Sequence, residues 1–598
     1  MSTYSAPIRD MKFVVKELVG LDEISALPGC EEVTPDLVDA VLEEAGKFAT
    51  GALDPLNRPG DKAGARLEGN AVITAPGFKE AFRKFCEGGW LSLANEPRWG
   101  GQGLPHIVSA QTSEMWNAAC MSFCLCPMLT AGVVHALSRH GTDTQQAAYL
   151  PNLVSGKWTG TMNLTEPQAG SDLSAVRARA TPEGDYYRIS GTKIFITWGE
   201  HDVAENIIHM VLARTPDAPE GVKGISLFLV PKFLVKEDGS LGARNDVKCV
   251  SIEHKLGIHA SPTCVMAYGD KQGAIGFLVG EENRGLEYMF TMMNFARLEV
   301  GIEGVAIADR AYQHALDYAK QRVQGREPGV RGGERVTIIH HPDVRRMLMS
   351  MKSQTEAMRA LASLASAELD KALLHPERAQ RARHQAMFDL LTPVVKGWCT
   401  EQSIEIASTG IQVHGGMGFV EETGAAQYLR DARITTIYEG TTAIQANDLT
   451  GRKVALEKGA TAKELIRQIR DLEKALAGVA SHPALGVIRR ALAEGVEALE
   501  QSTEWLIDTY PRNVKAAAAG SVPYLKLFGI VTGGWLMARS ALIAKHRLDD
   551  KAQDHDFYRA KLATARFYAD HILPQGLALK QAVLNGSAST LALEETQF

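Results

Sequence analysis

The chain has 598 residues, of which 45% are hydrophobic and 22% are charged. These proportions are ordinary for a soluble globular protein, and the length predicts three or four domains at about 150 residues each. The formal net charge is −6, whereas a dominant nucleic-acid surface is normally basic. The composition therefore argues against nucleic acid as a partner.

The eight cysteines are sparse and show no paired spacing of the kind that binds zinc. Cys124 and Cys126 are separated by one residue, which is too close for the usual zinc or redox motif. We interpret the cysteines as free thiols in a reducing compartment, and we expect no metal site.

The N-terminus and the most apolar late stretch both argue against targeting or membrane insertion. Residues 1–10 carry charge and lack an apolar core, so no secretory signal is expected. Residues 524–544 are interrupted by Lys526, Gly533 and Arg539, whereas a membrane span needs about 20 mostly apolar residues. We interpret this stretch as a pair of core helices and expect a cytoplasmic protein without stable membrane insertion.

The hydrophobic pattern changes along the chain and marks the expected domains. Residues 1–34 form an N-terminal extension, and helical spacing over residues 35–157 predicts an N-terminal helical domain. Residues 158–284 contain strand-like runs between turn signals, and no helices alternate with them. This favours a central antiparallel β-barrel over a βαβ fold.

Helical periodicity returns after the strands. Residues 285–452 contain segments long enough for a four-helix bundle, and residues 453–598 read as an additional C-terminal helical domain with a break at residues 520–523. The predicted fold class is therefore α+β and mostly α. The main strands are expected at 187–190, 193–197, 207–213 and 225–230, and the bundle helices at 298–324, 342–374 and 386–408.

The segment Met162–Asp172 ends a predicted strand and then turns sharply. Its backbone N–H groups and the hydroxyls of Thr165 and Ser171 suit an anionic or heteroaromatic ligand. A proline-glycine turn without a ligand fits the same residues. Further along, Phe195 and Thr197 are two residues apart and should face one side of a strand, where Phe195 is either a core residue or a cofactor contact.

Two helix ends carry further candidate binding residues. Arg322 lies near the end of a predicted helix, where it can complement the helix dipole, hold a phosphate or simply remain solvated. Residues 410–419 form a glycine-rich turn between helices, but no strand precedes them, so a Rossmann dinucleotide site is excluded. Close approach to a ligand or to another subunit remains open.

The run 430–445 places one carboxylate, Glu439, before Gly440 and two threonines, where a short loop should open a new helix. Glycine allows close backbone approach to a ligand, and threonine hydroxyls can cap the helix or contact the ligand. Taken alone, this loop is better explained as a helix cap than as a catalytic site.

Together these segments resemble the acyl-CoA dehydrogenase flavoprotein family, and specifically its larger bacterial members with an added C-terminal helical domain. The resemblance covers about residues 35–450, and the tail matches the larger subgroup alone. The matching motifs occur in the family's order and comprise Thr165-Glu166-Pro167, Ala169-Gly170-Ser171-Asp172, Phe195-Ile196-Thr197, Gln412 with Gly415-Gly416-Met417-Gly418-Phe419, and Arg430-Asp431 through Thr441.

The resemblance implies that FAD is the cofactor and that Thr165, Ser171 and Thr197 bond the flavin ring and phosphate. Phe195 lies where many relatives carry a tryptophan packed on the flavin, and Trp198 replaces the usual asparagine. The expected FAD contacts are Met162, Leu164, Thr165, Gly170, Ser171, Phe195, Thr197, Arg322, Gln412, Gly416 and Thr441.

Arg322, Gln412 and Gly416 match positions that reach the FAD of a neighbouring subunit, which implies an oligomer with shared sites. The added C-terminal domain should cover surface that smaller relatives bury in tetramers, so we expect a homodimer. By the same resemblance, the acyl-CoA substrate is expected to contact Ser171, Ser261, Asn294, Arg297 and Gly440.

The family's reaction removes an α-proton and a β-hydride from a saturated acyl-CoA. The resemblance implies that Glu439 is the general base that takes the α-proton. Hydrogen bonds to the thioester oxygen stabilise the developing negative charge, at about 3–4 kcal/mol per donor, and exclusion of water raises the basicity of the carboxylate. The resemblance supplies one such donor from the N–H of Glu439 itself and the other from a flavin hydroxyl. Some relatives carry the base at the position of Ala296, which cannot serve here.

The expected activity is oxidation of an acyl-CoA to a trans-2-enoyl-CoA in fatty acid β-oxidation, with electrons passing to an electron-transfer flavoprotein. The alternatives are an acyl-CoA oxidase that uses O₂ and a DNA-associated flavoprotein, against which the balanced charge of residues 461–598 argues. The acyl chain stays open: straight saturated chains are favoured as the commonest case, and one branch of the subgroup uses methylthiopropionyl-CoA.

Overall fold

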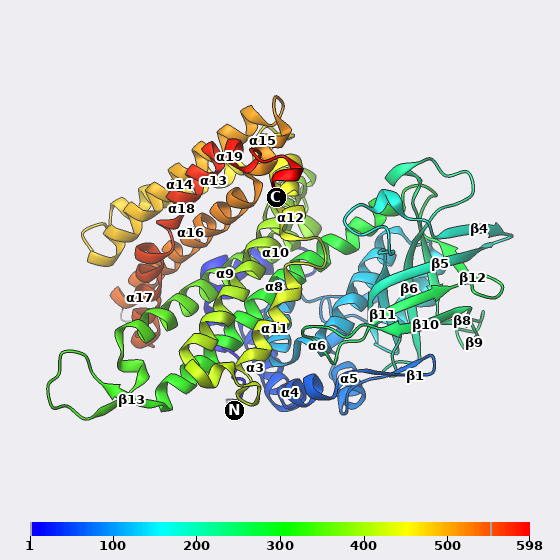
Figure 1. Ribbon diagram of the computed structural model, residues 1–598, viewed down its shortest axis with the longest axis horizontal. Helices are drawn as coiled ribbons and strands as arrows, with labels where there is room; N and C mark the ends of the chain where they lie inside the picture. Colours follow the sequence, from blue (N-terminus) through cyan, green and yellow to red (C-terminus); the bar gives the residue numbers. More distant parts are fainter. Residues whose placement is uncertain (1–2, 551–552) are drawn as a thin grey trace. The chain divides into compact units, whose positions relative to one another are not determined.

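The computed structural model describes residues 3–550 and 553–598, which fall into two compact units. We call Lys47–Leu104 together with Ala119–Glu299 the barrel unit. We call Met1–Gly46, Pro105–Ala118 and Val300–Phe598 together the helical unit (Figure 1). The chain is mostly helical with a curled sheet in its middle, as the sequence predicts.

The barrel unit is built on one curled sheet whose strands follow the order β10-β11-β5-β12-β7-β6-β3, with β4 paired to β5. The predicted strands are confirmed, and the 187–190 and 193–197 runs belong to one long strand, β5. The bounds are β3 Trp158–Asn163, β4 Arg179–Glu183, β5 Tyr186–Thr197, β6 Asn206–Ala213, β7 Ser226–Pro231, β10 Val247–Ile252, β11 Thr263–Tyr268 and β12 Ala274–Leu278.

One pairing in this sheet differs from the antiparallel arrangement that the sequence predicts. Strands β3 and β6 are parallel, with Trp158 opposite Asn206, whereas the other neighbours in the sheet are antiparallel. Parallel neighbours need a long crossover, and here β4 and β5 lie between the two strands in the sequence. The sheet is therefore mixed and not purely antiparallel, and it curls into a half-barrel.

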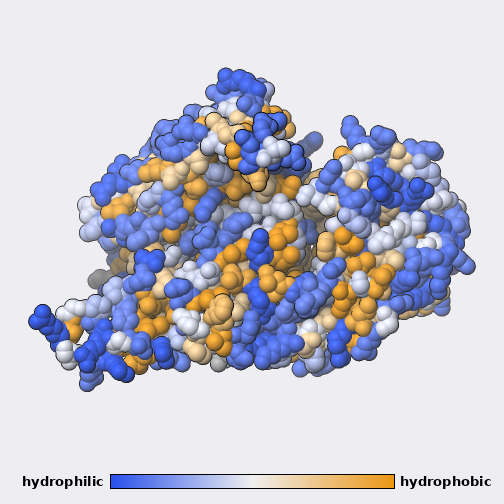
Figure 2. Space-filling model, in the orientation of Figure 1, coloured by the Kyte–Doolittle hydropathy of each residue, from blue (hydrophilic) through white to orange (hydrophobic). Residues whose placement is uncertain are grey.

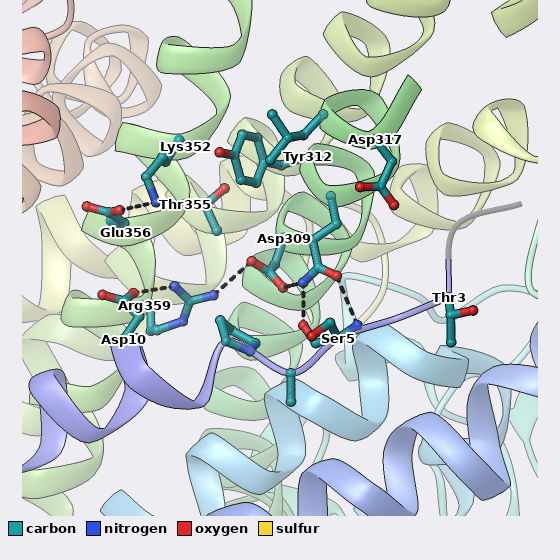
Figure 3. A pocket seen from close by; sticks show the side chains of 14 residues that line it. Thr3, Ser5, Asp10, Asp309, Tyr312, Asp317, Lys352, Thr355, Glu356 and Arg359 are labelled. Carbon is teal, nitrogen blue, oxygen red and sulfur yellow. Dashed lines mark hydrogen bonds and ion pairs between the residues drawn. The ribbon is translucent and has the colours of Figure 1, made fainter. Parts of the chain in front are cut away.

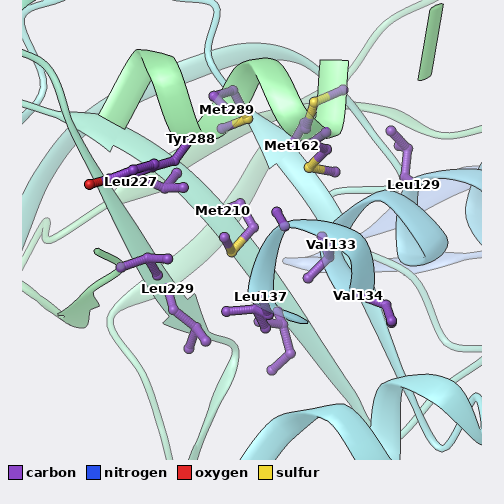
Figure 4. Close-up of a cluster of buried hydrophobic side chains, with 14 of the residues drawn as sticks. Leu129, Val133, Val134, Leu137, Met162, Met210, Leu227, Leu229, Tyr288 and Met289 are labelled. Carbon is purple, nitrogen blue, oxygen red and sulfur yellow. The ribbon is translucent and has the colours of Figure 1, made fainter. Parts of the chain in front are cut away.

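Strand β6 is buried on both faces of the sheet, since every one of its residues is buried. Ile208, Met210 and Leu212 belong to a hydrophobic cluster that also contains Val133 of α6 (His106–His140) and Met289 of α8 (Gly285–Gln321) (Figure 4). The alternate residues, which include Val211 and Ala213, belong to a second cluster inside the curl. Both faces of β6 are therefore apolar: one packs against helices and the other against the second cluster.

The remaining elements of the barrel unit are helices, which the sequence predicts for residues 35–157, and two short hairpins, which it does not predict. Helix α6 continues into the helical unit and has a non-helical kink at Cys120. The bounds are α4 Asp54–Ala63, α5 Phe78–Glu87, α6 His106–His140, α7 Asp143–Val154, β1 Arg66–Glu68, β2 Ala71–Ile73, β8 Phe233–Val235 and β9 Leu241–Arg244.

The helical unit is centred on α9 (Pro342–Leu374) and α10 (Arg378–His414), which pack side by side (Figure 1). The predicted bounds of α9 are confirmed. Helix α10 extends six residues beyond the predicted end, so Gln412 lies in its last turn and the glycine-rich turn begins only at Gly415. The other elements are α8 Gly285–Gln321, β13 Val323–Arg326, β14 Arg335–Thr337, α11 Ala425–Thr435 and α12 Thr442–Asn447.

The C-terminal helices surround α16, and the predicted break near residue 520 is confirmed. Helix α16 is a single helix and not the predicted pair, because Gly529, Gly533 and Gly534 stay within it and let Trp398, Tyr568 and Leu573 pack against its backbone. The bounds are α13 Ala460–Ala477, α14 Pro483–Thr509, α15 Val514–Ala519, α16 Ser521–Asp549, α17 His555–His571, α18 Gln575–Asn585 and α19 Ser587–Thr590.

Helices α6 and α16 are each long and apolar enough to cross a membrane by length and composition. In both helices 83% of the most apolar 18-residue window is buried within the protein. Buried core helices of this length and composition meet the same criterion as membrane-spanning helices. Hydrophilic residues predominate on the face shown in Figure 2, with apolar residues in smaller groups.

The N-terminal segment is joined to the bundle by buried charges at Asp10. Its helices are α1 Ile8–Phe13, α2 Leu21–Ser25 and α3 Pro35–Phe48. Arg359 of α9 is 3% exposed and contacts the carboxylates of Asp10, Glu114 and Asp309 at 2.6, 2.6 and 3.1 Å beside a cavity of about 310 Å³ (Figure 3). Lys561 of α17 also pairs with Asp10. This charge cluster joins α1, α6, α8, α9 and α17.

Candidate active site

The loop after β3 is fixed by a buried ion pair that the sequence analysis did not single out. Lys193 of β5 is fully buried, and its Nζ lies 2.8 Å from the Glu166 carboxylate and donates to the Leu164 carbonyl at 3.0 Å. Glu166 also accepts from the backbone N–H groups of Arg177 and Ala178 at 2.7 and 3.0 Å. Every part of the pair is therefore satisfied inside the protein.

The pKa values of this pair follow from burial and mutual attraction. Burial lowers the pKa of Lys193 to about 8, although the Glu166 carboxylate opposes the shift. Burial alone would raise the pKa of Glu166, but the Lys193 ammonium and two backbone donors bring it below its usual value. Glu166 is therefore ionised at neutral pH and holds the loop through charge-assisted bonds.

The same loop presents unused hydrogen-bonding groups. Thr165 is half-buried and Ser171 exposed, and within residues 3–550 and 553–598 neither hydroxyl has a protein hydrogen-bond partner. Leu164 is half-buried and Gly170 exposed, so both remain accessible to a ligand. Met162 is 7% exposed and packs in the core cluster, so a ligand would meet its backbone and not its side chain.

Phe195 offers a flat apolar surface because β5 carries an extra residue there. Lys193 lies opposite Met266 and Ile196 opposite Cys264, which leaves two residues of β5 between these pairs against one residue of β11. Phe195 adopts φ +58° and is 58% exposed, so the simple alternation of the strand does not hold through it. An exposed ring on a fixed bulge suits a planar heteroaromatic ligand.

Thr197 and Trp198 follow directly. Thr197 is half-buried, and within the described ranges its hydroxyl has no protein partner. Trp198 is 1% exposed and stacks on Phe78 at 6.5 Å between ring centroids. The replacement of the family's asparagine by tryptophan therefore fills the core next to the loop.

The expected substrate contacts of the barrel unit are mostly buried. Ser261 is fully buried, and its hydroxyl has no partner among the described residues. Arg297 is 3% exposed with its guanidinium 5.8 Å from the centre of the Phe290 ring, and Asn294 is half-buried. Ala296 is 1% exposed and belongs to the core cluster, so no side chain at that position can act as a base.

In the helical unit, Glu439 lies between α11 and α12, as the sequence predicts. Thr441 caps α12 by accepting from the N–H of Ile444 at 3.4 Å. Glu439 is half-buried and adopts φ +53°, a left-handed conformation that costs a non-glycine residue about 1–3 kcal/mol. Such strain persists where the surroundings over-determine it, which is typical of functional residues.

The residue before Glu439 is held by α8. The hydroxyl of Tyr438 donates to the carboxylate of Glu303, which is 1% exposed. Burial raises the pKa of Tyr438 well above its usual value, and Glu303 acts in the same direction. The hydroxyl therefore stays protonated and anchors the loop to α8.

The remaining predicted cofactor residues of the helical unit are exposed. Arg322 directly follows α8, Gln412 lies in the last turn of α10, and Gly416 lies in a short 3₁₀ turn, Gly415–Phe419. In this turn Met417 is 48% and Phe419 89% exposed. These residues are therefore accessible to a ligand or to another subunit.

The protein is mostly helical, and its half-barrel carries an exposed aromatic ring and hydroxyls without a partner among the described residues, a surface that suits a planar cofactor. Models of acyl-CoA dehydrogenase N-terminal, middle and C-terminal domains match residues 39–157, 161–270 and 283–453. A model of an acetyl-CoA dehydrogenase C-terminal-like domain matches residues 465–594.

Several relatives match nearly the whole chain. A 3-methylmercaptopropionyl-CoA dehydrogenase of Ruegeria pomeroyi is 52% identical over 96% of both chains. A butyryl-CoA dehydrogenase of Syntrophomonas wolfei is 35% identical over 100% of this chain and 99% of its own length. An acyl-CoA dehydrogenase of Bacillus anthracis complexed with FAD shares the fold at TM-score 0.73 and 19% identity, over 98% of this chain and 93% of its own.

The chain belongs to the acyl-CoA dehydrogenase family. It is therefore an oxidoreductase with FAD as its cofactor, and the resemblance seen in the sequence is confirmed. The unpartnered hydroxyls of Thr165 and Ser171 and the exposed ring of Phe195 fit a flavin, which needs hydrogen-bond donors and an aromatic face.

Proposed function

We propose that the enzyme converts a saturated acyl-CoA to the trans-2-enoyl-CoA, with Glu439 as the base that removes the α-proton. The observation that carries this proposal is the Glu439 loop, in which a half-buried carboxylate is kept at φ +53° between two helices. A base held in one strained conformation is preorganised for proton transfer.

The chain's residues have separate tasks in this reaction. The Glu439 carboxylate takes the α-proton, and its own N–H donates to the thioester oxygen as negative charge develops there, a contribution of about 3–4 kcal/mol. Ser171, Ser261, Asn294, Arg297 and Gly440 are proposed to bind the thioester and its CoA portion. Bound FAD supplies the acceptor for the β-hydride.

The proposed cofactor contacts form one group in each unit. In the barrel unit, Phe195 packs on the flavin ring, while Thr165, Ser171 and Thr197 donate or accept hydrogen bonds. Met162, Leu164 and Gly170 contribute through the backbone of the same loop. Arg322, Gln412 and Gly416 bind the FAD of a second subunit in a homodimer, and Thr441 contacts the cofactor beside the base.

The substrate we propose is 3-methylmercaptopropionyl-CoA, a short thioether acyl-CoA. The support is the relative of that name, at 52% identity over 96% of the chain. The butyryl-CoA dehydrogenase relative supports an acyl chain of similar, short length. The proposal places the enzyme in the oxidation of a sulfur compound, and straight-chain β-oxidation is the alternative.

A panel of acyl-CoA thioesters with an artificial electron acceptor tests the substrate. Pentanoyl-CoA is the matched control, because it replaces the sulfur of 3-methylmercaptopropionyl-CoA by one methylene. We expect kcat/KM to be highest for the thioether, and loss of two hydrogens in the product. A pocket that discriminates one methylene-sized group gives about 10–200-fold between neighbours in such a series. A preference for long chains would contradict the proposed substrate.

The electron acceptor is proposed to be an electron-transfer flavoprotein, and we place the enzyme in the cytoplasm. An acyl-CoA oxidase would instead return its electrons to O₂. The lifetime of the reduced flavin in air distinguishes the two enzymes. A reduced flavin that persists in air for much longer than one turnover supports the dehydrogenase, and rapid reoxidation by O₂ overturns the dehydrogenase assignment. Mass measurement of the purified enzyme in solution tests the homodimer.

The base is tested by Glu439→Gln, with Glu494→Gln as a control that removes an exposed carboxylate from α14. General-base catalysis contributes about 10²–10⁴-fold, so the first variant should keep its bound yellow flavin and lose nearly all turnover. The control should match the parent. Turnover of Glu439→Gln within about tenfold of the parent would remove Glu439 from the mechanism.

A further inference from the structure

Helix α10 carries a buried lysine that no step of the proposed reaction uses. Lys396 is fully buried, and its Nζ donates to the carbonyl oxygen of Gly440 at 2.7 Å. Lysine is almost never fully buried unless its charge is paired or hydrogen-bonded, so this placement needs a reason. The acceptor belongs to the residue directly after Glu439.

A second buried side chain holds the same stretch of backbone. Gln445 of α12 is fully buried, and its Nε2 donates to the carbonyl of Glu439 at 3.0 Å and to that of Gly440 at 3.4 Å. The hydroxyl of Thr442 donates to the Glu401 carboxylate at 2.5 Å, which ties the start of α12 to α10. Two consecutive carbonyls are thus held by donors from two different helices.

These donors fix the conformation that the base needs. Glu439 has φ +53° and Gly440 φ +90°, and a Cβ on Gly440 would lie 2.7 Å from the Nε2 of Gln445. With both carbonyls held, the two peptide planes after Glu439 cannot rotate to relieve the strain, so Glu439 keeps its left-handed conformation and its side chain keeps its direction. A misplacement of about 1 Å in such a group can cost a hundredfold in rate.

We propose that Lys396 is a positioning residue for the general base, and that it acts by locking the Glu439-Gly440 backbone together with Gln445. The inference rests on the proposed role of Glu439. Lys396 itself does not touch the substrate or the flavin in this account.

The test compares holoenzyme variants at Lys396. Lys396→Met keeps the apolar stem and removes the donor, and Lys396→Gln restores a neutral donor. Lys561→Met is the matched control, because it removes another buried lysine of the helical unit that contacts Asp10 and Glu356 and not the loop. The probe is 3-methylmercaptopropionyl-CoA and its α-dideuterated form, with flavin bleaching followed in anaerobic single turnovers.

We expect Lys396→Met to retain FAD and to lower the rate of flavin bleaching about a hundredfold, with KM within about threefold of the parent. The α-deuterium isotope effect should rise, because proton transfer becomes slower than the other steps. Lys396→Gln should recover part of the rate. Lys561→Met should lose stability and keep both the rate and the isotope effect.

A folded Lys396→Met with a rate and an isotope effect like the parent's overturns the inference. If this variant does not fold, Gln445→Leu decides, since it removes the other donor to the loop: a rate within about threefold of the parent also overturns it. Failure of the proposed function is separate, because it shows as activity in Glu439→Gln, whereas failure of this inference leaves Glu439→Gln inactive.

Discussion

Replacement of Lys193 by Met should destabilise the barrel unit and weaken FAD binding together. The change keeps the length of the side chain but removes the ammonium that lies 2.8 Å from Glu166 and 3.0 Å from the Leu164 carbonyl. Glu166 is 4% exposed and would remain charged in the interior with its backbone donors alone. Removal of one partner from a buried ion pair costs about 3–5 kcal/mol.

Lys248→Met is the matched control for this prediction. Lys248 of β10 pairs with Asp270 at 2.6 Å, but its side chain is 43% exposed, and exposed pairs contribute about 0–1 kcal/mol. Urea denaturation followed by circular dichroism measures the free energy of unfolding, and flavin fluorescence measures FAD affinity. We expect a large loss of both in Lys193→Met and little change in Lys248→Met. Equal stability of the two variants would refute the role of the buried pair.

Three further predictions concern pH, the flavin surface and the charge cluster. The pKa of Lys193 is about 8 in the folded protein, below its value in the unfolded chain, so between these two pKa values the native state binds fewer protons than the unfolded state. The free energy of unfolding of the parent should therefore increase as pH rises through this range. Thermal melting at several pH values should show this increase in the parent and not in Lys193→Met. Phe195→Ala should weaken FAD binding about 2–10-fold by titration, as expected for loss of a ring contact of about 0.5–1.5 kcal/mol, while Phe195→Trp should not. Arg359→Met should lower the free energy of unfolding, measured in urea, by about 3–5 kcal/mol. The loss should be larger at about pH 8 than at about pH 6, because burial raises the pKa of Glu114 to about 7 and a protonated carboxyl group needs no cation beside it.

Local patterns in the sequence account well for the elements of this fold. The period of the apolar residues predicts the bounds of α9, and the alternation of short runs predicts β5, β6 and β7. The Glu439 loop is also placed correctly between two helices, because Gly440 and Thr441 are local signals for a turn and a cap. These features depend on neighbours in the sequence.

The features that the sequence does not predict depend on distant partners. Lys396 is 44 residues from Gly440, and Lys193 is 27 residues from Glu166, so nothing local identifies either pair. The bulge at Phe195 depends on the register with β11, which is distant in the sequence. An isolated lysine among the apolar residues of a strand or helix is the one available signal, and it does not name its partner.

The role of Glu439 is tested most directly by rapid anaerobic mixing of FAD-loaded Glu439→Gln with 3-methylmercaptopropionyl-CoA, beside the parent and Glu494→Gln. Bleaching of the flavin reports the first oxidation of the substrate, without any contribution from the electron acceptor. We predict rapid bleaching in the parent and the control, and a rate about 10²–10⁴-fold lower in Glu439→Gln at equal FAD content. Bleaching of Glu439→Gln at the rate of the parent would contradict the account.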